Sequence, residues 1–278
     1  MRRLASAITA LGLGLMCAST ASAQQQPMKQ RLDEARSLVG KQDYETAITR
    51  LREARDAAGD ADRARVDNAL GWTLFTAGDA KGAQQQLEQA QRQAEPSADA
   101  DLKIRIANNL GVVLFSQGEL EKARAQFEGP ASHGSDLAIR YLGLIDQQVQ
   151  ANRVNELISE GIYARRALQF EAAVAAYSKA LELAPRNPRA LEYRGYANFR
   201  LGRPDAALPD LQRSRELDPA NVNTVINLLK VHCKARDRAA AEKVAADARD
   251  LLIENRAVVQ SDRELREVCG ADLAKLLP

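Results

Sequence analysis

The chain has 278 residues, of which 45% are hydrophobic, 27% charged and 4% aromatic. Its 39 lysines and arginines nearly balance 37 aspartates and glutamates, which argues against bulk electrostatic attraction to nucleic acid or an anionic membrane. Alanine, glutamine, leucine, arginine and glutamate dominate, and no run alternates apolar and polar residues as a half-buried strand would. The composition therefore predicts an all-α protein.

Residues 1–23 have the organisation of a secretory signal peptide. Arg2 and Arg3 precede an apolar run from Leu4 to Ala18, and Ala21-Ser22-Ala23 supplies a small-x-small cleavage signal before Gln24. The run is shorter than the roughly 20 residues that span a bilayer. We therefore expect cleavage, export to the periplasm or the exterior, and no membrane insertion.

Two consequences follow from this assignment. Cleavage would leave 37 basic and 37 acidic residues, so the mature chain is expected to be neutral. Lipidation of Cys17 is the alternative to cleavage before Gln24, although Met16 and Gly14 depart from the usual lipobox.

A pattern of small and apolar residues recurs between residues 24 and 130. It reads Leu70-Gly71 with Ala83, Leu87 and Ala90, and 40 residues later Leu110-Gly111 with Ala123 and Phe127. A weaker first copy contains Ala35, Ala47, Leu51 and Ala54. These three copies define a first block of the chain.

The repeat is interrupted between residues 131 and 153. Gly129-Pro130 stops the third copy early, and small polar residues with turn chemistry follow as far as Asp136. We expect a lone helix from Leu137 to Gln150 that joins two blocks, with a hinge at residues 129–136. The alternative is a worn repeat that has lost part of its length.

The clearest copies lie in the block from residue 154 to 278. The fourth copy contains Leu157, Gly161, Ala173, Tyr177, Ala180 and Pro185, and the fifth contains Leu191, Gly195, Ala207, Leu211, Ser214 and Pro219, at an offset of 34 residues. A sixth copy has Leu228-Leu229, Ala241, Ala245 and Ala248, without the glycine and the proline. A capping helix is expected from about Asp262 to Leu276.

This pattern resembles the tetratricopeptide repeat, which has a period of 34 residues and runs W-x2-L-G-x2-Y, then A-x3-F, then P. The resemblance implies a right-handed superhelical solenoid of antiparallel helix hairpins, about six in two blocks. Such a solenoid is a surface for other molecules, and the fold alone does not name them.

The resemblance also implies a concave groove lined by the first helix of each hairpin. In the first block it would present Arg65, Asn68, Trp72, Phe75, Arg105, Asn108 and Phe115. In the more basic second block it would present Arg165, Arg166, Arg189, Tyr196, Phe199, Arg200, Lys230 and Lys234. Arginine and asparagine can bind amides and carboxylates, and aromatic residues supply apolar anchors, so a peptide-binding groove is expected. The alternative is that the Arg/Asn pairs solvate a helix face and that Trp72 packs between helices.

No arrangement of residues predicts catalysis, a metal site or a cofactor. His133 and His232 have no carboxylate or cysteine at metal-ligand or triad spacing, and Asp99 before a helical run predicts a helix cap. Cys233 and Cys269 are the only cysteines after residue 23. In an oxidising compartment they are expected to form a disulfide between the sixth copy and the cap.

The favoured hypothesis is a non-catalytic periplasmic or secreted scaffold. Its groove would hold an extended peptide or a helix of a partner protein, within an envelope secretion or export assembly. The alternative is a polysaccharide-binding module of an exopolysaccharide export system, in which Trp72, Tyr196 and Phe199 stack on sugar rings. Nucleic acid is not expected as a partner.

Overall fold

The computed structural model describes residues 27–276, so the signal peptide predicted at residues 1–23 lies outside the described residues. Within the described range every regular element is helical. The chain divides into two compact units, one ending at Gln147 and the other beginning at Gln148.

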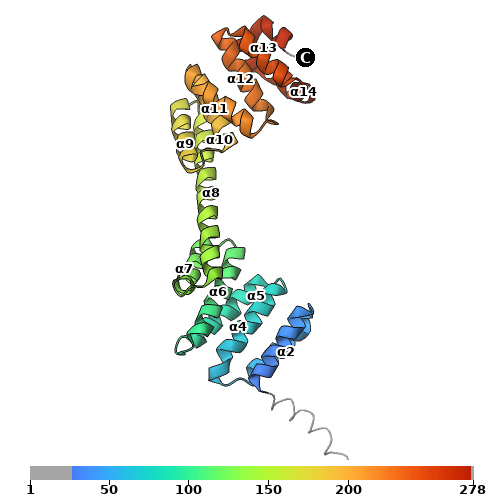
Figure 1. Cartoon of the computed structure of the whole chain (residues 1–278), viewed down its shortest axis with the longest axis vertical. Coiled ribbons are helices and arrows are strands. Elements are labelled where there is room, and N and C mark those ends of the chain that lie inside the picture. The colour runs from blue at the N-terminus through green and yellow to red at the C-terminus, as the bar shows by residue number, and fades with distance from the viewer. Residues whose placement is uncertain (1–26, 277–278) are drawn as a thin grey trace, which may run out of the picture. The chain divides into compact units, whose positions relative to one another are not determined.

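The first unit contains three helix hairpins. They are α2 (Met28–Gly40) with α3 (Tyr44–Asp56), α4 (Asp60–Thr76) with α5 (Ala80–Ala94), and α6 (Ala100–Ser116) with α7 (Leu120–Ser132). The first helices also pack against one another, since α4 contacts both α2 and α6 (Figure 1). Three first helices lying side by side form one continuous face of this unit.

The second unit continues the same arrangement. Its helices are the C-terminal part of α8 (Asp136–Arg166), α9 (Phe170–Leu183), α10 (Pro188–Arg200), α11 (Pro204–Leu217), α12 (Val222–Ala235) and α13 (Arg238–Asp247). Four short helices and a 3-10 turn follow: α14 (Arg249–Glu254), α15 (Arg256–Ser261), α16 (Arg263–Cys269), η1 (Gly270–Asp272) and α17 (Leu273–Leu276).

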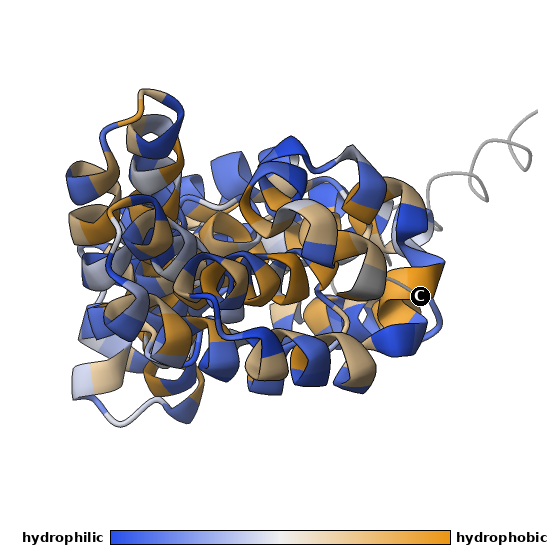
Figure 2. Cartoon of the chain, turned by 90° about the horizontal axis from the view of Figure 1, so that it is seen from above, coloured by the Kyte–Doolittle hydropathy of each residue, from blue (hydrophilic) through white to orange (hydrophobic). Residues whose placement is uncertain are grey.

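The repeat glycines allow the two helices of a hairpin to approach closely. A Cβ atom at Gly161 would lie 2.3 Å from the ring of Tyr177, and one at Gly111 would lie 2.6 Å from the ring of Phe127. Both rings are fully buried. Hydrophobic residues occupy one side of most helices and hydrophilic residues the other (Figure 2). The small residues of the pattern therefore hold each hairpin together through close packing.

The connection between the blocks differs from the prediction. Gly129 and Pro130 belong to the last turn of α7, so the turn is confined to residues 133–135. The helix expected at residues 137–150 is not a separate element, because α8 runs without interruption for 31 residues. Residues 151–153 contain no glycine or proline to break it.

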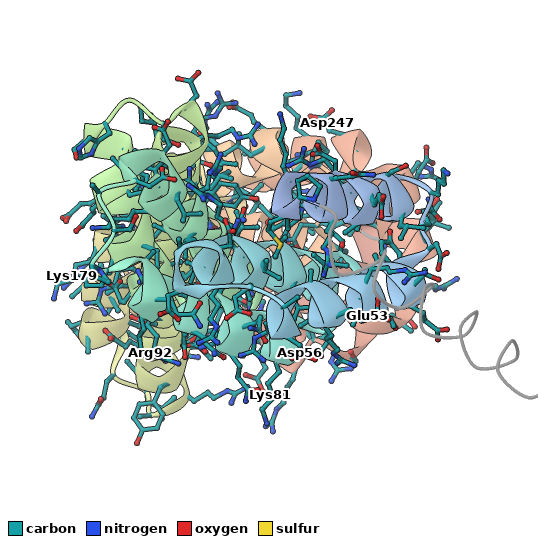
Figure 3. All side chains as sticks on the ribbon, turned by 90° about the horizontal axis from the view of Figure 1, so that it is seen from below. Glu53, Asp56, Lys81, Arg92, Lys179 and Asp247 are labelled. Carbon is teal, nitrogen blue, oxygen red and sulfur yellow. A yellow bond between two sulfur atoms is a disulfide. The ribbon has the colours of Figure 1, made fainter. Side chains whose placement is uncertain are left out.

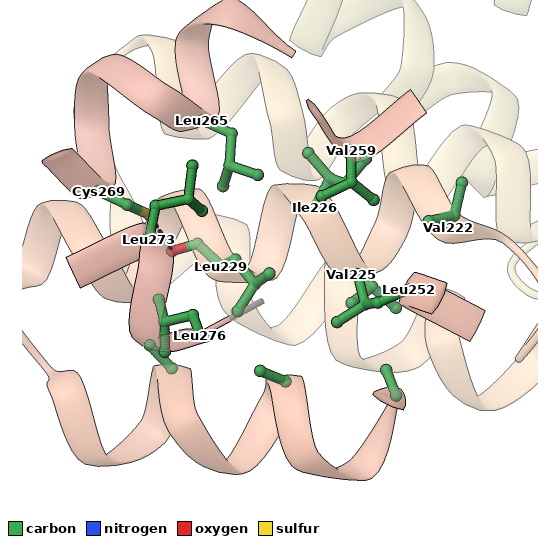
Figure 4. Close-up of a cluster of buried hydrophobic side chains, with 13 residues drawn as sticks. Val222, Val225, Ile226, Leu229, Leu252, Val259, Leu265, Cys269, Leu273 and Leu276 are labelled. Carbon is green, nitrogen blue, oxygen red and sulfur yellow. Dashed lines mark hydrogen bonds between the residues drawn. The ribbon is translucent and has the colours of Figure 1, made fainter. Parts of the chain in front are cut away.

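The C-terminal cap also differs from the single helix predicted at residues 262–276. Gly270, with a φ of +54°, ends α16 and separates it from α17. The cap encloses a hydrophobic core in which Leu265 and Val259 pack with Ile226 and Leu229 of α12 (Figure 4). A disulfide joins Cys233 of α12 to Cys269 of α16, as predicted, with their Cα atoms 5.0 Å apart. This bond holds α16 along α12.

Candidate functional site

The first unit has a hollow on the face formed by α2, α4 and α6, which we call the first-block groove. Its volume is about 430 Å³. It is lined by Leu32, Ala35, Arg36, Val39, Leu51, Arg65, Asn68, Ala69, Trp72, Thr73, Leu102, Arg105 and Asn109. Three arginines line the groove and no aspartate or glutamate does. The groove therefore combines cationic side chains with apolar surface.

Four of the residues predicted for the first block line this groove: Arg65, Asn68, Trp72 and Arg105. Trp72 is half-buried, and its ring lies 5.5 Å from that of Phe75, measured between centroids. One part of the indole packs against the hydrophobic core of the unit while another borders the groove. Both interpretations of Trp72, as a packing residue and as a groove residue, therefore hold in part.

Arg65 is held in position by two carboxylates. Its guanidinium donates to Asp99 at 2.8 Å and to Asp62 at 3.2 Å. Asp99 caps α6, as predicted, because it accepts the backbone N–H of Leu102 at 2.9 Å. The hydrogen bond from that backbone N–H lowers the pKa of Asp99 the most, and the hydrogen bond from Arg65 lowers it further. The charge of Arg65 is therefore largely neutralised within the chain.

The other two arginines of the groove are less engaged. Arg36 is exposed and pairs with Asp33 on the same helix, at 3.1 Å. Arg105 is also exposed, and among residues 27–276 it forms no ion pair. An exposed ion pair within one helix contributes little to stability, so Arg36 can exchange Asp33 for a ligand. Both guanidinium groups can therefore bind an anionic group that enters the groove.

An amide pair links α4 to α6 at the groove. Nδ2 of Asn109 donates to Oδ1 of Asn68 at 2.9 Å. Asn108 was expected at this position, but its Nδ2 donates to Ser135 Oγ at 3.1 Å, and it does not line the groove. Adjacent helix residues point about 100° apart, so the choice between Asn108 and Asn109 depends on the rotation of α6.

The two phenylalanines predicted for the first-block groove lie elsewhere. Phe75 and Phe115 do not line it. Both are half-buried and pack against the hydrophobic core of the unit. The ring of Phe115 meets Tyr141 of α8 edge-on, with centroids 5.2 Å apart. Phe115 therefore helps to attach α8 rather than to form a binding surface.

In the second unit the equivalent face is covered by α16. The hydroxyl of Tyr196 donates to Glu264 Oε2 at 2.9 Å, and Lys230 Nζ lies 3.1 Å from the same oxygen. Lys230 also pairs with Asp262 at 2.8 Å, and Arg200 Nε lies 3.3 Å from Glu264 Oε1. Three of the residues predicted to bind a partner therefore bind the protein's own cap.

Other residues predicted for the second block contact aromatic rings. Arg165 lies 5.2 Å from the centroid of Tyr193, and Arg189 donates from Nε to the Tyr193 hydroxyl at 3.2 Å. Phe199 is buried in the core, with Lys234 Nζ 5.0 Å from its ring centroid. Arg166 is exposed at the end of α8. These contacts stabilise the unit itself.

Glu192 is a buried carboxyl group behind this face. Its Oε1 accepts the Nδ2 of Asn227 at 2.8 Å. Burial raises the pKa of Glu192 to about 7, and the nearby positive charges, Arg165 first, offset that rise only in part. Nothing in the sequence marks Glu192, because only its packing between α10 and α12 distinguishes it from an exposed glutamate.

Helix hairpins that stack through small residues and present a hollow face define a helical-repeat protein. The family model described as "Tetratricopeptide repeat" matches residues 32–98, 68–132 and 158–222, which together exceed half of the chain. The chain therefore belongs to the tetratricopeptide repeat family, as the sequence pattern predicted. Members of this family are typically non-catalytic scaffolds for protein–protein interaction.

Several solved structures are similar to the chain. A structure of the TPR2AB domain of yeast Sti1 in a pHSP90 complex has 19% identity and a TM-score of 0.44, and the match covers 87% of this chain and 96% of that one. PilF of Pseudomonas aeruginosa has 15% identity and a TM-score of 0.37, with 90% and 97% covered. PilW, a type IV pilus biogenesis factor, has 17% identity and a TM-score of 0.34, with 88% and 99% covered.

No curated protein is significantly similar to the chain in sequence. Within the described part of the chain, no helix combines the length and the apolar composition needed to cross a membrane.

Proposed function

We propose that the protein is a non-catalytic interaction scaffold that binds a segment of a partner protein in the first-block groove. The observation that carries the proposal is the difference between the two concave faces. The first-block groove is open and is bordered by the exposed guanidinium groups of Arg36 and Arg105, whereas Lys230 and Arg200 of the second unit are bound to the cap. A groove of this kind suits a peptide or a helix.

We further propose that the scaffold works outside the cytoplasm, in an envelope secretion or export assembly. The support is the signal-like sequence of residues 1–23, together with the Cys233–Cys269 disulfide, which suits an oxidising compartment. Intact-mass measurement of protein from its native source tests export. The expected mass is that of a chain that begins at Gln24. The mass of a chain that retains residues 1–23, or that carries diacylglycerol on Cys17, contradicts the proposed cleavage.

The polysaccharide alternative has less support. It depends on Trp72, Tyr196 and Phe199 as stacking platforms for sugar rings. Phe199 is buried, with 3% of its surface exposed, and the Tyr196 hydroxyl is bonded to Glu264. Only Trp72 borders an open groove, so we retain a protein segment as the proposed ligand.

A pull-down from envelope extract, with the mature chain as bait, identifies the partner, and a variant then tests the site. Arg105→Ala is expected to weaken binding by about ten- to a hundredfold, because a charge-assisted hydrogen bond contributes about 1.5 to 3 kcal/mol. Isothermal titration calorimetry with the purified partner measures this change.

The matched control is Arg92→Ala. Arg92, labelled in Figure 3, is exposed on α5 and does not line the groove. It is expected to bind like the parent. If Arg105→Ala also binds like the parent, and circular dichroism shows both variants folded, the first-block groove is not the binding site.

A further inference from the structure

The two units repeat one network on their concave faces. In the first, Asn109 of α6 donates to Asn68 of α4 at 2.9 Å. In the second, Asn227 of α12 donates to Glu192 of α10 at 2.8 Å. Both bonds join the first helices of consecutive hairpins. The two faces can therefore be compared position by position.

An aromatic residue follows each acceptor by one helical turn. Trp72 lies four residues after Asn68, and Tyr196 lies four residues after Glu192. Residues four apart occupy the same face of a helix. Trp72 and Tyr196 therefore occupy equivalent positions, and what contacts Tyr196 in one unit indicates what can contact Trp72 in the other.

The segment that contacts Tyr196 is acidic on one side and apolar on the other. Glu264 accepts the Tyr196 hydroxyl and lies within 3.3 Å of both Arg200 and Lys230, and Asp262 pairs with Lys230. From the same short helix, Leu265 is fully buried in the hydrophobic core. The chain itself thus shows that this concave face accepts a helix that turns carboxylates toward its basic side chains and buries an apolar residue.

The equivalent position in the first unit is open. No described segment covers the hollow beside Trp72, which measures about 430 Å³. Its wall offers the guanidinium groups of Arg36 and Arg105, and the apolar surfaces of Trp72 and Leu32. A ligand that completes this site must bring carboxylates for the arginines and apolar side chains for the remaining wall.

We infer that the first-block groove binds an acidic amphipathic helix of a partner protein, in the way that α16 is bound in the second unit. This inference rests on the proposed function and adds the chemistry of the ligand. Two carboxylates on one side of the helix pair with Arg36 and Arg105, and an apolar residue packs beside Trp72. Because these pairs are exposed, binding weakens as salt concentration rises.

Selection from a displayed library of random 15-residue peptides on the mature chain tests the inference. Enriched peptides are expected to carry at least two aspartates or glutamates on one helical face, with apolar residues on the other. For a selected peptide, calorimetry is expected to show at least tenfold weaker binding to Arg105→Ala and unchanged binding to Arg92→Ala. Replacing its glutamates by glutamine and its aspartates by asparagine is expected to weaken binding to the same degree.

The outcomes separate the inference from the function on which it rests. If peptides bind in a manner that depends on Arg105 but the amide-substituted version binds as tightly, the acidic ligand is wrong and the groove remains a peptide site. Enrichment of neutral or basic peptides leads to the same conclusion. If no enriched peptide is affected by Arg105→Ala, the groove does not bind peptides and both proposals are overturned.

Discussion

The two units use one face of the same fold in opposite ways. In the second, Lys230 and Arg200 are bound to Asp262 and Glu264 of the cap. In the first, Arg36 and Arg105 border an open hollow. The second block is the more basic in sequence, yet its positive charges are less available. The number of charges on a repeat face therefore does not indicate a binding site, because their pairing within the chain decides which of them can meet a ligand.

The largest expected effect tests whether the cap stabilises only the second unit. Replacing Cys233 and Cys269 by serine removes a cross-link between residues separated by 36 positions. On the chain-entropy model this lowers the free energy of unfolding by about 4 kcal/mol, an upper value because native strain subtracts from it. Urea denaturation measures the loss. Hydrogen exchange is expected to accelerate in α12–α17 and to remain unchanged in α2–α7.

Reduction of the parent protein provides the comparison for that variant, since it breaks the same bond without substituting any residue. It is expected to lower stability by a similar amount. Equal acceleration of exchange in α4 and α6 would show that the two units do not respond separately, and would remove the basis for comparing them.

The second prediction concerns the titration of Glu192, which occupies the position that Asn68, a residue that does not titrate, occupies in the first unit. Burial raises the pKa of Glu192 to about 7, whereas the ordinary value for a glutamate is 4.5. Between these values the folded state binds more protons than the unfolded state, so the stability contributed by Glu192 falls as pH rises from about 4.5 to about 7. The total change is about 3 kcal/mol, and it is constant above this range.

Glu192→Gln tests the prediction because glutamine keeps the oxygen that accepts from Asn227 and does not titrate. The variant is expected to match the parent near pH 4 and to exceed its stability at pH 8 by about 3 kcal/mol. Urea denaturation at several pH values measures the difference. A difference that does not change with pH would mean that folding leaves the pKa of Glu192 unshifted.

The third prediction concerns the close contacts inside the hairpins. Gly161→Ala places a methyl group 2.3 Å from the rigid ring of Tyr177, so a loss of about 1 to 3 kcal/mol is expected. Gly143 of α8 follows a leucine, as Gly71 and Gly111 do, but a Cβ atom there meets nothing within 4 Å. Gly143→Ala is therefore expected to stabilise the protein by about 0.5 to 1 kcal/mol.

Thermal or urea denaturation of the two alanine variants measures both changes. Opposite signs are the expected result. If Gly161→Ala is as stable as the parent, the hairpin packs less tightly than its geometry indicates.

The hairpins could be predicted from the sequence because their close contacts depend on local spacing. Gly161 and Tyr177 lie 16 residues apart, as do Gly111 and Phe127, and the two members of each pair meet across one turn. The continuity of α8 was not predicted because the repeat pattern suggests two helices there. Only the lack of a glycine or proline at residues 151–153 favours one helix.

The candidate site could be predicted only in part. The spacing from the repeat glycine located Arg65, Asn68, Trp72 and Arg105 on the groove. It did not decide between Asn108 and Asn109, which differ by a rotation of α6. It also gave no indication that Asp262 and Glu264 would occupy the second face, because the predicted disulfide places the cap beside α12 without fixing which of its side chains meet Lys230. Contacts between distant segments have no periodic signal in the sequence.

The distribution of tryptophan and tyrosine gives each unit its own spectroscopic label. Trp72 is the only tryptophan of the chain, and four of the six tyrosines, Tyr163, Tyr177, Tyr193 and Tyr196, lie after residue 147. Emission excited selectively from indole therefore reports on the first unit alone, while ultraviolet absorbance of the phenol rings reports mainly on the second. The melting of the two units can thus be followed separately in the unmodified protein, without a dye or an added residue.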